Sequence, residues 1–180
     1  MKALIVIDFT NDFIDGSLPV GQPGIDIAPR VGELVQAFVD SGDYVVMAVD
    51  LHDGDDPYHP ETKLFPPHNL RGSRGRELYG ELAKVYEANK DAIYWMDKTR
   101  YSAFAGTDLE LKLRAHGITE LHLIGVCTDI CVLHTAVDAY NRGFELIIHE
   151  DAVASFNPAG HEWALGHFAG NLGASVVSGK

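Results

Sequence analysis

The chain has 180 residues, of which 46% are hydrophobic, and its formal net charge at pH 7 is −12. A chain of this length can bury a core without disulfide bonds, and we expect a single domain over residues 1–180. The acidic balance has no basic block to offset it, which argues against nucleic acid or an anionic membrane as a partner. The two cysteines stand four residues apart, so they cannot join distant parts of the fold, and we expect free thiols in a reducing compartment.

The N-terminal segment predicts a buried strand. Residues 3–7 form a continuous apolar run, which is typical of a central parallel strand covered on both faces. The run is too short to span a bilayer, meets Asp8 at once and has no small-residue cleavage site behind it, so we expect a cytoplasmic protein. In open α/β sheets, ligands bind beyond the carboxyl ends of the strands, which makes Asp8 a candidate site residue. A lone Asp at this place is more often a turn residue.

The next elements alternate between helix and strand. A polar loop over residues 9–24 precedes an amphipathic helix over residues 27–41, which Gly42 ends. A second strand over residues 44–49 again leads into an acid, Asp50. A second carboxylate is therefore expected where a strand ends.

A long stretch without clear secondary structure, residues 50–75, follows the second strand. Loops of this length inside a compact domain are usually functional or disordered, and the prolines and aromatic residues here are able to pack. The stretch is rich in side chains that bind hard-to-borderline metals: Asp50, His52, His59, Glu61 and His68. The residues alone leave two interpretations open, a metal site or a solvated acidic loop with incidental histidines.

The second half of the chain continues the alternation. Further helices are expected over residues 76–89, 108–116 and 157–170. Further strands are expected over residues 93–96, 121–126, 144–149 and 174–177. The pattern predicts a doubly wound, three-layer α/β/α fold with a mostly parallel central sheet. Because parallel strands end on one edge of the sheet, we expect Asp8, Asp50 and Lys98 to converge there with the segment that follows residue 126.

That segment belongs to LHLIGVCTDICVLHTAVDAY, residues 121–140, which indicates a buried strand, a sharp turn and the start of a helix. A thiol at such a bend can lie at a helix N-terminus, where backbone N–H groups and the macrodipole favour a thiolate. Cys131 is therefore the candidate nucleophile. Asp8 could accept its proton and Lys98 could hold both anions, which would allow acyl transfer through a thioester with release of ammonia or an amine. Backbone N–H groups of Cys127 and Cys131 could stabilise the oxyanion.

The side chain of Cys127 has several interpretations. A redox pair with Cys131 is possible in principle, but the spacing is not the C-x-x-C of disulfide oxidoreductases. A zinc site of the two cysteines with His134 lacks a fourth ligand nearby. We therefore interpret the Cys127 thiol as a small buried hydrophobic group.

Four segments in the same order resemble a known family: DLH at 50–52, HPETKLFPPHN at 59–69, WMDKTRYSAFAGTDL at 95–109 and GVCTDICVLHTAVDAY at 125–140. Together they resemble the isochorismatase-like cysteine hydrolase superfamily, and within it the bacterial nicotinamidases, over nearly the whole chain. The resemblance implies Asp8, Lys98 and Cys131 as the catalytic triad. It also implies a cis peptide between Val126 and Cys127 that helps to shape the oxyanion hole. The implied reaction is hydrolysis of nicotinamide to nicotinate and ammonia, a step of NAD salvage.

The same resemblance implies a divalent metal that holds the pyridine nitrogen of the substrate. The implied ligands are Asp50, His52 and His68, with either His59 or Glu61 as the fourth. We favour Glu61, because HPETKLFPPHN resembles the acidic-ligand variant of the family. Zinc is the expected ion, although a mixed nitrogen and oxygen set also accepts iron or manganese. The pocket wall is expected from four aromatic residues: Phe13, Phe65, Trp95 and Tyr101.

Two other functions stay open. Amidases of the superfamily that act on carbamoyl or ureido groups share the triad but generally lack the metal cluster, so Asp50, His52 and His68 argue against them. A non-catalytic binding domain on the same fold would be indicated by loss of a triad residue, and all three are present. True isochorismatases do not need a nucleophilic cysteine, so the presence of Cys131 argues against their vinyl-ether reaction. The expected partner is a small amide, with the oligomeric state, including a homo-oligomer, left open.

Overall fold

The computed structural model describes residues 1–179 of the chain. Six parallel strands form one sheet in the order β3-β2-β1-β4-β5-β6. Their bounds are β1 (Lys2–Ile7), β2 (Tyr44–Asp50), β3 (Ile93–Lys98), β4 (Glu120–Val126), β5 (Glu145–Ala154) and β6 (Ser175–Val177). The strand order reverses between β1 and β4, so the switch point at which such sheets bind ligands lies between their carboxyl ends.

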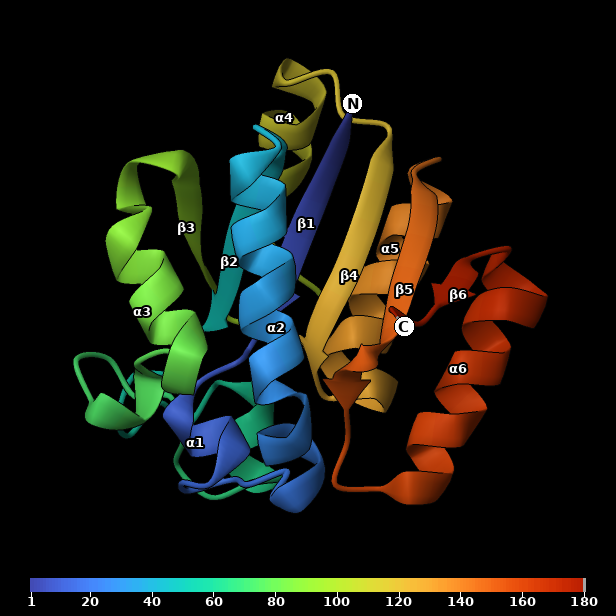
Figure 1. Cartoon of the computed structure of the whole chain (residues 1–180). Coiled ribbons are helices and arrows are strands. Elements are labelled where there is room, and N and C mark those ends of the chain that lie inside the picture. The colour runs from blue at the N-terminus through green and yellow to red at the C-terminus, as the bar shows by residue number, and fades with distance from the viewer. Residues whose placement is uncertain (180) are drawn as a thin grey trace.

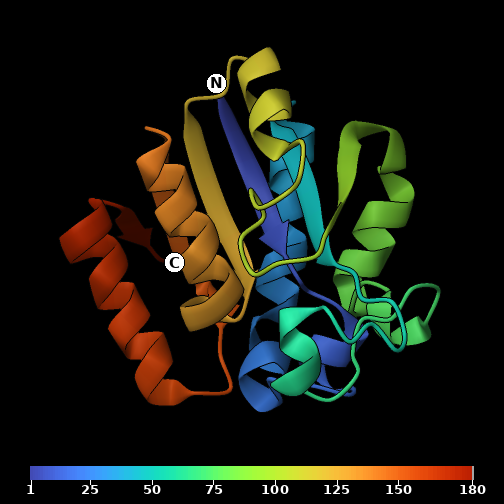
Figure 2. The ribbon, with the colours of Figure 1, turned by 180° about the vertical axis from the view of Figure 1, so that it is seen from behind.

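Helices cover both faces of the sheet, which confirms the predicted three-layer fold (Figures 1 and 2). On one face lie α2 (Gln22–Asp40) and α3 (Gly80–Ala88). On the other face lie α4 (Leu109–Ala115), α5 (Leu133–Asn141) and α6 (Pro158–Leu172). The short helix α1 (Asn11–Ile14) lies at the carboxyl end of the sheet (Figure 1). None of the helices among residues 1–179 is both long and apolar enough to cross a membrane.

The apolar run of β1 is explained by burial on both faces. Ala3, Ile5 and Ile7 pack into the core under α4, α5 and α6. Leu4 and Val6 pack into the core under α2 and α3. Each large apolar side chain buried in this way contributes about 1.5–3 kcal/mol, so β1 is held from both sides.

Two predicted helices begin more than one residue away from their predicted starts. The first long helix begins at Gln22, five residues before the predicted start at residue 27, with a proline in its first turn where a missing N–H costs nothing. The next helix begins at Gly80 and not at residue 76, because the chain before it forms a bridge between Leu78 and Thr10 beside β1. Both shifts concern the polar segments near the carboxyl edge.

The strand register brings the carboxyl ends together. Asp50 pairs with Lys98 across β2 and β3, and Ile7 pairs with Gly125 across β1 and β4. Gly125 has a φ of 112°, and a Cβ at this position would lie 2.0 Å from the carbonyl oxygen of Ile7. Only glycine permits this close approach of the two backbones. The bend after β4 is thereby brought against the end of β1, where Asp8 follows.

Candidate active site

Asp8, Lys98 and Cys131 meet at the carboxyl edge of the sheet, where Asp8 directly follows β1, Lys98 ends β3 and Cys131 lies on the bend after β4. Lys98 Nζ lies 2.8 Å from Asp8 Oδ2 and 3.7 Å from Cys131 Sγ. It also donates a hydrogen bond of 2.9 Å to the carbonyl oxygen of Arg100. Asp8 and Lys98 are fully buried, and Cys131 is 6% exposed. The structure therefore brings the three predicted residues together, with Lys98 between the other two.

The backbone turns sharply at Asp8. Its φ of 54° lies in the left-handed region, which Asp adopts more readily than most residues. Its N–H still donates to the carbonyl oxygen of Ala48 on β2, at 3.0 Å. Its Oδ1 accepts a 2.8 Å hydrogen bond from the N–H of Asp50, so β2 fixes both the backbone and the carboxylate of Asp8.

Burial controls the charges of this group. It raises the pKa of Asp8 to about 6, against the lowering effect of the Lys98 charge. Burial lowers the pKa of Lys98, but the charges of Asp8 and Cys131 outweigh it and keep the ammonium protonated. Burial also raises the pKa of Cys131 well above its usual range, although Lys98 acts in the opposite direction. Burial and the neighbouring carboxylates therefore act against the thiolate that the bend and Lys98 were expected to favour.

The bend itself has the predicted cis peptide between Val126 and Cys127. A wide π-helical turn, Thr128–Val132, follows and leads into α5. The carbonyl oxygen of Cys127 accepts the N–H groups of Ile130 and Val132, at 3.1 and 3.2 Å. Burial raises the pKa of the Cys127 thiol to about 12, so this side chain stays protonated and agrees with a structural interpretation.

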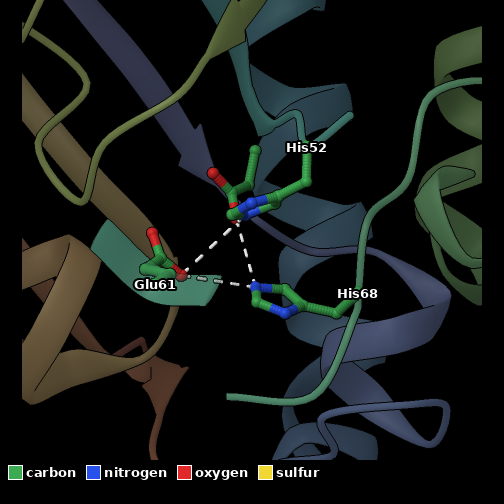
Figure 3. A group of neighbouring side chains, drawn as sticks. His52, Glu61 and His68 are labelled. Atoms are coloured by element: carbon green, nitrogen blue, oxygen red, sulfur yellow. Dashed lines mark hydrogen bonds and ion pairs between the residues drawn. The ribbon is translucent and has the colours of Figure 1, made fainter. Parts of the chain in front are cut away.

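Four buried side chains gather next to the Asp8–Lys98 pair: Asp50, His52, Glu61 and His68. Each offers one ligand atom, and these atoms lie within 4.8 Å of one another. Figure 3 shows His52, Glu61 and His68 converging from three parts of the chain. Nε2 of His68 lies 3.5 Å from Asp50 Oδ2 and 3.4 Å from Glu61 Oε2, and Nε2 of His52 lies 2.6 Å from Asp50 Oδ2.

The polar atoms of this group fit a divalent metal. Nδ1 of His68 must carry a proton, because it donates to the carbonyl oxygen of Pro66 at 2.8 Å. Its buried Nε2 points at the two carboxylates and has no hydrogen-bond partner within residues 1–179. Burial lowers the pKa of His68, but the nearby carboxylates of Asp50 and Glu61 outweigh this effect and raise the pKa to about 10. The surroundings therefore favour a positive charge, and a mixed nitrogen and oxygen set suits zinc, iron or manganese.

The two candidates for the fourth ligand are separated by their hydrogen bonds. Nε2 of His59 donates to the carbonyl oxygen of Thr99 at 2.6 Å, and its Nδ1 accepts the N–H of Glu61 at 3.2 Å. Both nitrogens of His59 are thus engaged, at the start of the short helix Pro60–Lys63. The carboxylate of Glu61 faces the other ligands, so the geometry favours Glu61 and gives His59 the role of orienting it.

A small apolar cavity lies beside Cys131. Three of the four expected aromatic residues line it, namely Phe13, Phe65 and Tyr101. Glu61 lines the same cavity, so the thiol and one of the four candidate metal ligands face one space.

Trp95 does not reach this cavity, and its prediction as a pocket residue is wrong. Its ring packs against Tyr86 of α3, with 5.2 Å between ring centroids, and its Nε1–H donates to Asp97 at 2.9 Å. The reason is strand geometry, because alternate side chains of a strand point to opposite faces of the sheet. Trp95 lies in mid-strand on the face that α2 and α3 cover, away from the carboxyl edge.

Three further cavity residues were missed by the sequence analysis: Leu18, Ile130 and Phe156. Phe156 lies at the edge because β5 continues to Ala154, five residues beyond the predicted end at 149. The pairing of β4 with β5 is irregular between Leu123 and Gly125, and it resumes with Val153 opposite Gly125. The apolar residues at 152–154 were the signal that the strand goes on.

The fold and the site together define a class, a three-layer α/β enzyme of the hydrolase type with its site at the switch point of a parallel sheet. Comparison with known proteins narrows this class. The family model described as Isochorismatase domain matches residues 2–180. The chain therefore belongs to the isochorismatase family.

Solved structures agree with this assignment. The crystal structure of nicotinamidase/pyrazinamidase PncA from Bacillus subtilis is 62% identical, with a TM-score of 0.96 over 98% of both chains. The pyrazinamidase of Pyrococcus horikoshii in complex with zinc is 32% identical, with a TM-score of 0.88 over 99% of both chains. The N-carbamoylsarcosine amidase of Thermoplasma acidophilum is 34% identical, with a TM-score of 0.85 over 98% of this chain and 95% of that one.

Proposed function

We propose that this protein is a nicotinamidase, which hydrolyses nicotinamide to nicotinate and ammonia in NAD salvage. The likeness to the Bacillus subtilis enzyme over nearly the whole chain supports the substrate. The single structural observation that carries the proposal is the shared cavity, in which Cys131 and the metal ligand Glu61 face the same space. A planar pyridine amide has one end to anchor and one end to cleave, and the cavity offers a group for each.

Asp8, Lys98 and Cys131 carry out the cleavage. Asp8, with a pKa near 6, accepts the proton of the buried thiol while Sγ attacks the amide carbon. The tetrahedral oxyanion accepts hydrogen bonds from the backbone N–H groups of Cys127 and Cys131, each worth about 3 kcal/mol in comparable sites. Asp8 then gives its proton to the leaving nitrogen, ammonia departs, and a thioester to Cys131 remains. Asp8 accepts a proton from the water that attacks the thioester carbon and passes it to the leaving sulfur of Cys131, and the acid product leaves as nicotinate after losing its carboxyl proton to solvent.

Lys98 stabilises the negative charge that moves between Asp8 and Cys131. Its ammonium lies beside Asp8 and Cys131, so it stabilises the negative charge on whichever of the two is ionised. Its hydrogen bond to the carbonyl oxygen of Arg100 fixes the direction of the amine. We assign it no proton-transfer step, because the neighbouring anions hold its pKa high.

The metal ligands and the aromatic residues of the cavity would orient the substrate. Asp50, His52, Glu61 and His68 would hold the divalent ion, most simply zinc, which supplies a Lewis-acid contact for the pyridine nitrogen. The zinc complex of the Pyrococcus horikoshii relative supports this assignment. Phe13, Phe65 and Tyr101 would pack on the pyridine ring. Their apolar surface would also keep bulk water from the acyl carbon during attack.

A carbamoyl amidase is the second candidate, because the Thermoplasma acidophilum relative is an N-carbamoylsarcosine amidase at 34% identity. The test is ammonia release by zinc-loaded protein from nicotinamide, pyrazinamide and N-carbamoylsarcosine, with metal analysis of the same sample. We expect the highest kcat/KM on nicotinamide and one bound metal per chain. Turnover of N-carbamoylsarcosine without turnover of nicotinamide would contradict the proposal.

The remaining assignments follow from this function. The chain acts as one hydrolase domain over residues 1–180, with a small amide as its partner. The two cysteines are free, which is usual in the reducing cytoplasm. The proposal involves no nucleic acid and no membrane.

A further inference from the structure

Asn69 directly follows the metal ligand His68 and is fully buried. Its φ of 46° lies in the left-handed region, where asparagine is among the few tolerated side chains. A buried amide must have its polar atoms paired, and that of Asn69 is paired on both sides. Its Oδ1 accepts the hydroxyl of Thr10 at 2.9 Å, and its Nδ2 donates to the carbonyl oxygen of Asp50 at 3.3 Å.

The backbone N–H and the backbone carbonyl oxygen of Asn69 are also hydrogen-bonded. Its N–H donates to Asp12 Oδ2 at 2.8 Å, and its carbonyl oxygen accepts the N–H of His52 at 3.1 Å. The next residue, Leu70, forms a parallel bridge with His52. One residue is thus bonded to the backbones of two metal ligands and covalently joined to a third.

These bonds close a long loop. His52 and His68 are sixteen residues apart along the chain, and Figure 3 shows them on separate segments. Asn69 joins the two segments directly, through Asp50 and His52 on one side and its own peptide bond to His68 on the other. The side chain of Asn69 and its left-handed backbone therefore contribute directly to the separation of the two imidazole nitrogens, beside the hydrogen bond from the N–H of Arg71 to the carbonyl oxygen of His52 at 2.9 Å.

The other ends of these bonds lie on the segment that leaves β1. Asp8, Thr10 and Asp12 are alternate residues of this segment. Asp8 binds the N–H of Asp50, while Thr10 and Asp12 bind Asn69. A Cβ on Gly75 would lie 2.1 Å from Asp12 Oδ2, so the carboxylate is also tightly enclosed on its far side. The segment that carries the proposed base thus also holds the metal-binding loop.

We propose that Asn69 is the positioning residue of the metal centre and that Thr10 is its main side-chain support. Asn69 touches neither substrate nor metal in this assignment. It sets the distance between the ligand pair Asp50–His52 and the ligand His68, and thereby the affinity for zinc. The inference rests on the metal centre of the proposed function, but its test measures zinc binding and not catalysis.

The first experiment compares two substitutions by glycine at left-handed positions of the same loop. Asn69→Gly keeps the backbone conformation and the backbone hydrogen bonds, and removes only the side-chain bonds to Thr10 and Asp50. Asp55→Gly is the matched control, because Asp55 has a φ of 61° and lies exposed outside the ligand group. The zinc dissociation constant is measured by competition with a chelator of known affinity. Partners behind metal ligands typically contribute about 10–100-fold, so we expect that loss for Asn69→Gly and an unchanged value for Asp55→Gly.

A second pair separates positioning from general loop stability. Thr10→Val removes the hydroxyl donor at nearly constant volume, and Thr10→Ser restores a hydroxyl at the same place. Both are measured for zinc affinity and for the free energy of unfolding without zinc. We expect weaker zinc binding in Thr10→Val and recovery in Thr10→Ser. This pair also keeps the test decisive if Asn69→Gly fails to fold.

The outcomes are distinct. Weakened zinc binding in Asn69→Gly and Thr10→Val, with Asp55→Gly and Thr10→Ser near wild type, supports the inference even if nicotinamide is not the substrate. Lower unfolding free energies with unchanged zinc affinity would overturn it, because Asn69 would then only hold the loop together. Wild-type protein that binds no zinc overturns it as well. Wild-type protein that binds zinc but releases no ammonia from nicotinamide overturns the proposed function alone.

Discussion

The two halves of the site are built in different ways. Asp8 and Lys98 lie on or directly after the strands β1 and β3, and Cys131 lies on the bend that the close approach of β4 to β1 positions. In the metal group only Asp50 belongs to a strand. The others come from the loop between β2 and α3: His52, Glu61 and His68. The triad is therefore fixed directly by the carboxyl ends of the strands, whereas the metal group is part of a loop that must be held against the sheet.

The two halves of the site also differ in the interactions that stabilise them. Asp8 and Lys98 are fully buried opposite charges, so removing either partner leaves an unpaired charge in the core. The metal ligands depend on hydrogen bonds within the loop and to the exit of β1, such as those of Asn69. Damage to the triad should therefore affect both catalysis and stability, while damage to the metal group should affect affinity and leave the fold intact. The following predictions test this contrast.

The largest expected effect is on turnover. Cys131→Ala should abolish ammonia release from nicotinamide, because no other thiol can replace it, while zinc content stays at the wild-type level. Cys127→Ala is the matched control, since it keeps the backbone N–H proposed for the oxyanion hole. Ammonia release and bound metal are measured on the same samples. Turnover retained in Cys131→Ala is incompatible with the thioester mechanism.

A large loss of stability is expected at the ion pair. Lys98→Met should lower the free energy of unfolding by about 3–5 kcal/mol, because Asp8 is left buried without its partner. Urea unfolding of the zinc-free protein gives the value. Arg71→Met is the control, since Arg71 pairs with Asp53 on the surface, where such pairs are worth about 0–1 kcal/mol. Equal effects of the two substitutions would contradict the contrast between sheet and surface.

Metal removal should act on binding more than on structure. Dialysis against a chelator is expected to raise KM for nicotinamide strongly, because the anchor for the pyridine nitrogen is lost. Far-ultraviolet circular dichroism should be unchanged, and added zinc should restore KM. If the chelated protein keeps its KM, the anchoring role is wrong. If it unfolds, the loop is less independent of the sheet than we describe.

The smallest effect is expected at Trp95. Because its ring lies against Tyr86 and outside the cavity, Trp95→Phe should change kcat/KM by no more than about twofold, as for substitutions away from special features. Phe65→Ala, inside the cavity, should raise KM clearly. Steady-state ammonia release measures both. A larger effect at Trp95 than at Phe65 would mean that the ring enters the site in a state other than this one.

The sequence predicts the strands and the residues at their carboxyl ends better than it predicts the other residues of the site. The apolar runs predict the strands, and the acid or lysine after each run predicts Asp8, Asp50 and Lys98, because parallel strands end on one edge. The direction of a side chain within a strand needs the pairing and face of that strand, which is why Trp95 was misassigned. Phe156 was missed because an irregularity in the pairing of β5 conceals the continuation of the strand.

Burial is the other quantity that the sequence does not contain. The bend and a nearby lysine both favour a thiolate at Cys131, yet burial raises its pKa above the usual range. The choice between His59 and Glu61 likewise depends on hydrogen bonds that only the folded loop defines, such as the one from His59 to Thr99. Asn69 is a single polar letter in the sequence, and its role follows only from its four bonds.

The most direct test of the central claim, that Cys131 attacks a substrate anchored by the metal group, is to trap the acyl-enzyme. Zinc-loaded protein is mixed with nicotinamide, quenched in acid within the first turnover and examined by mass spectrometry of the intact chain and of its peptides. We predict a nicotinoyl thioester on Cys131 that hydroxylamine removes and that is absent in Cys131→Ala. Acylation of Cys127, or rapid ammonia release with no acylated chain at any time, would contradict the account.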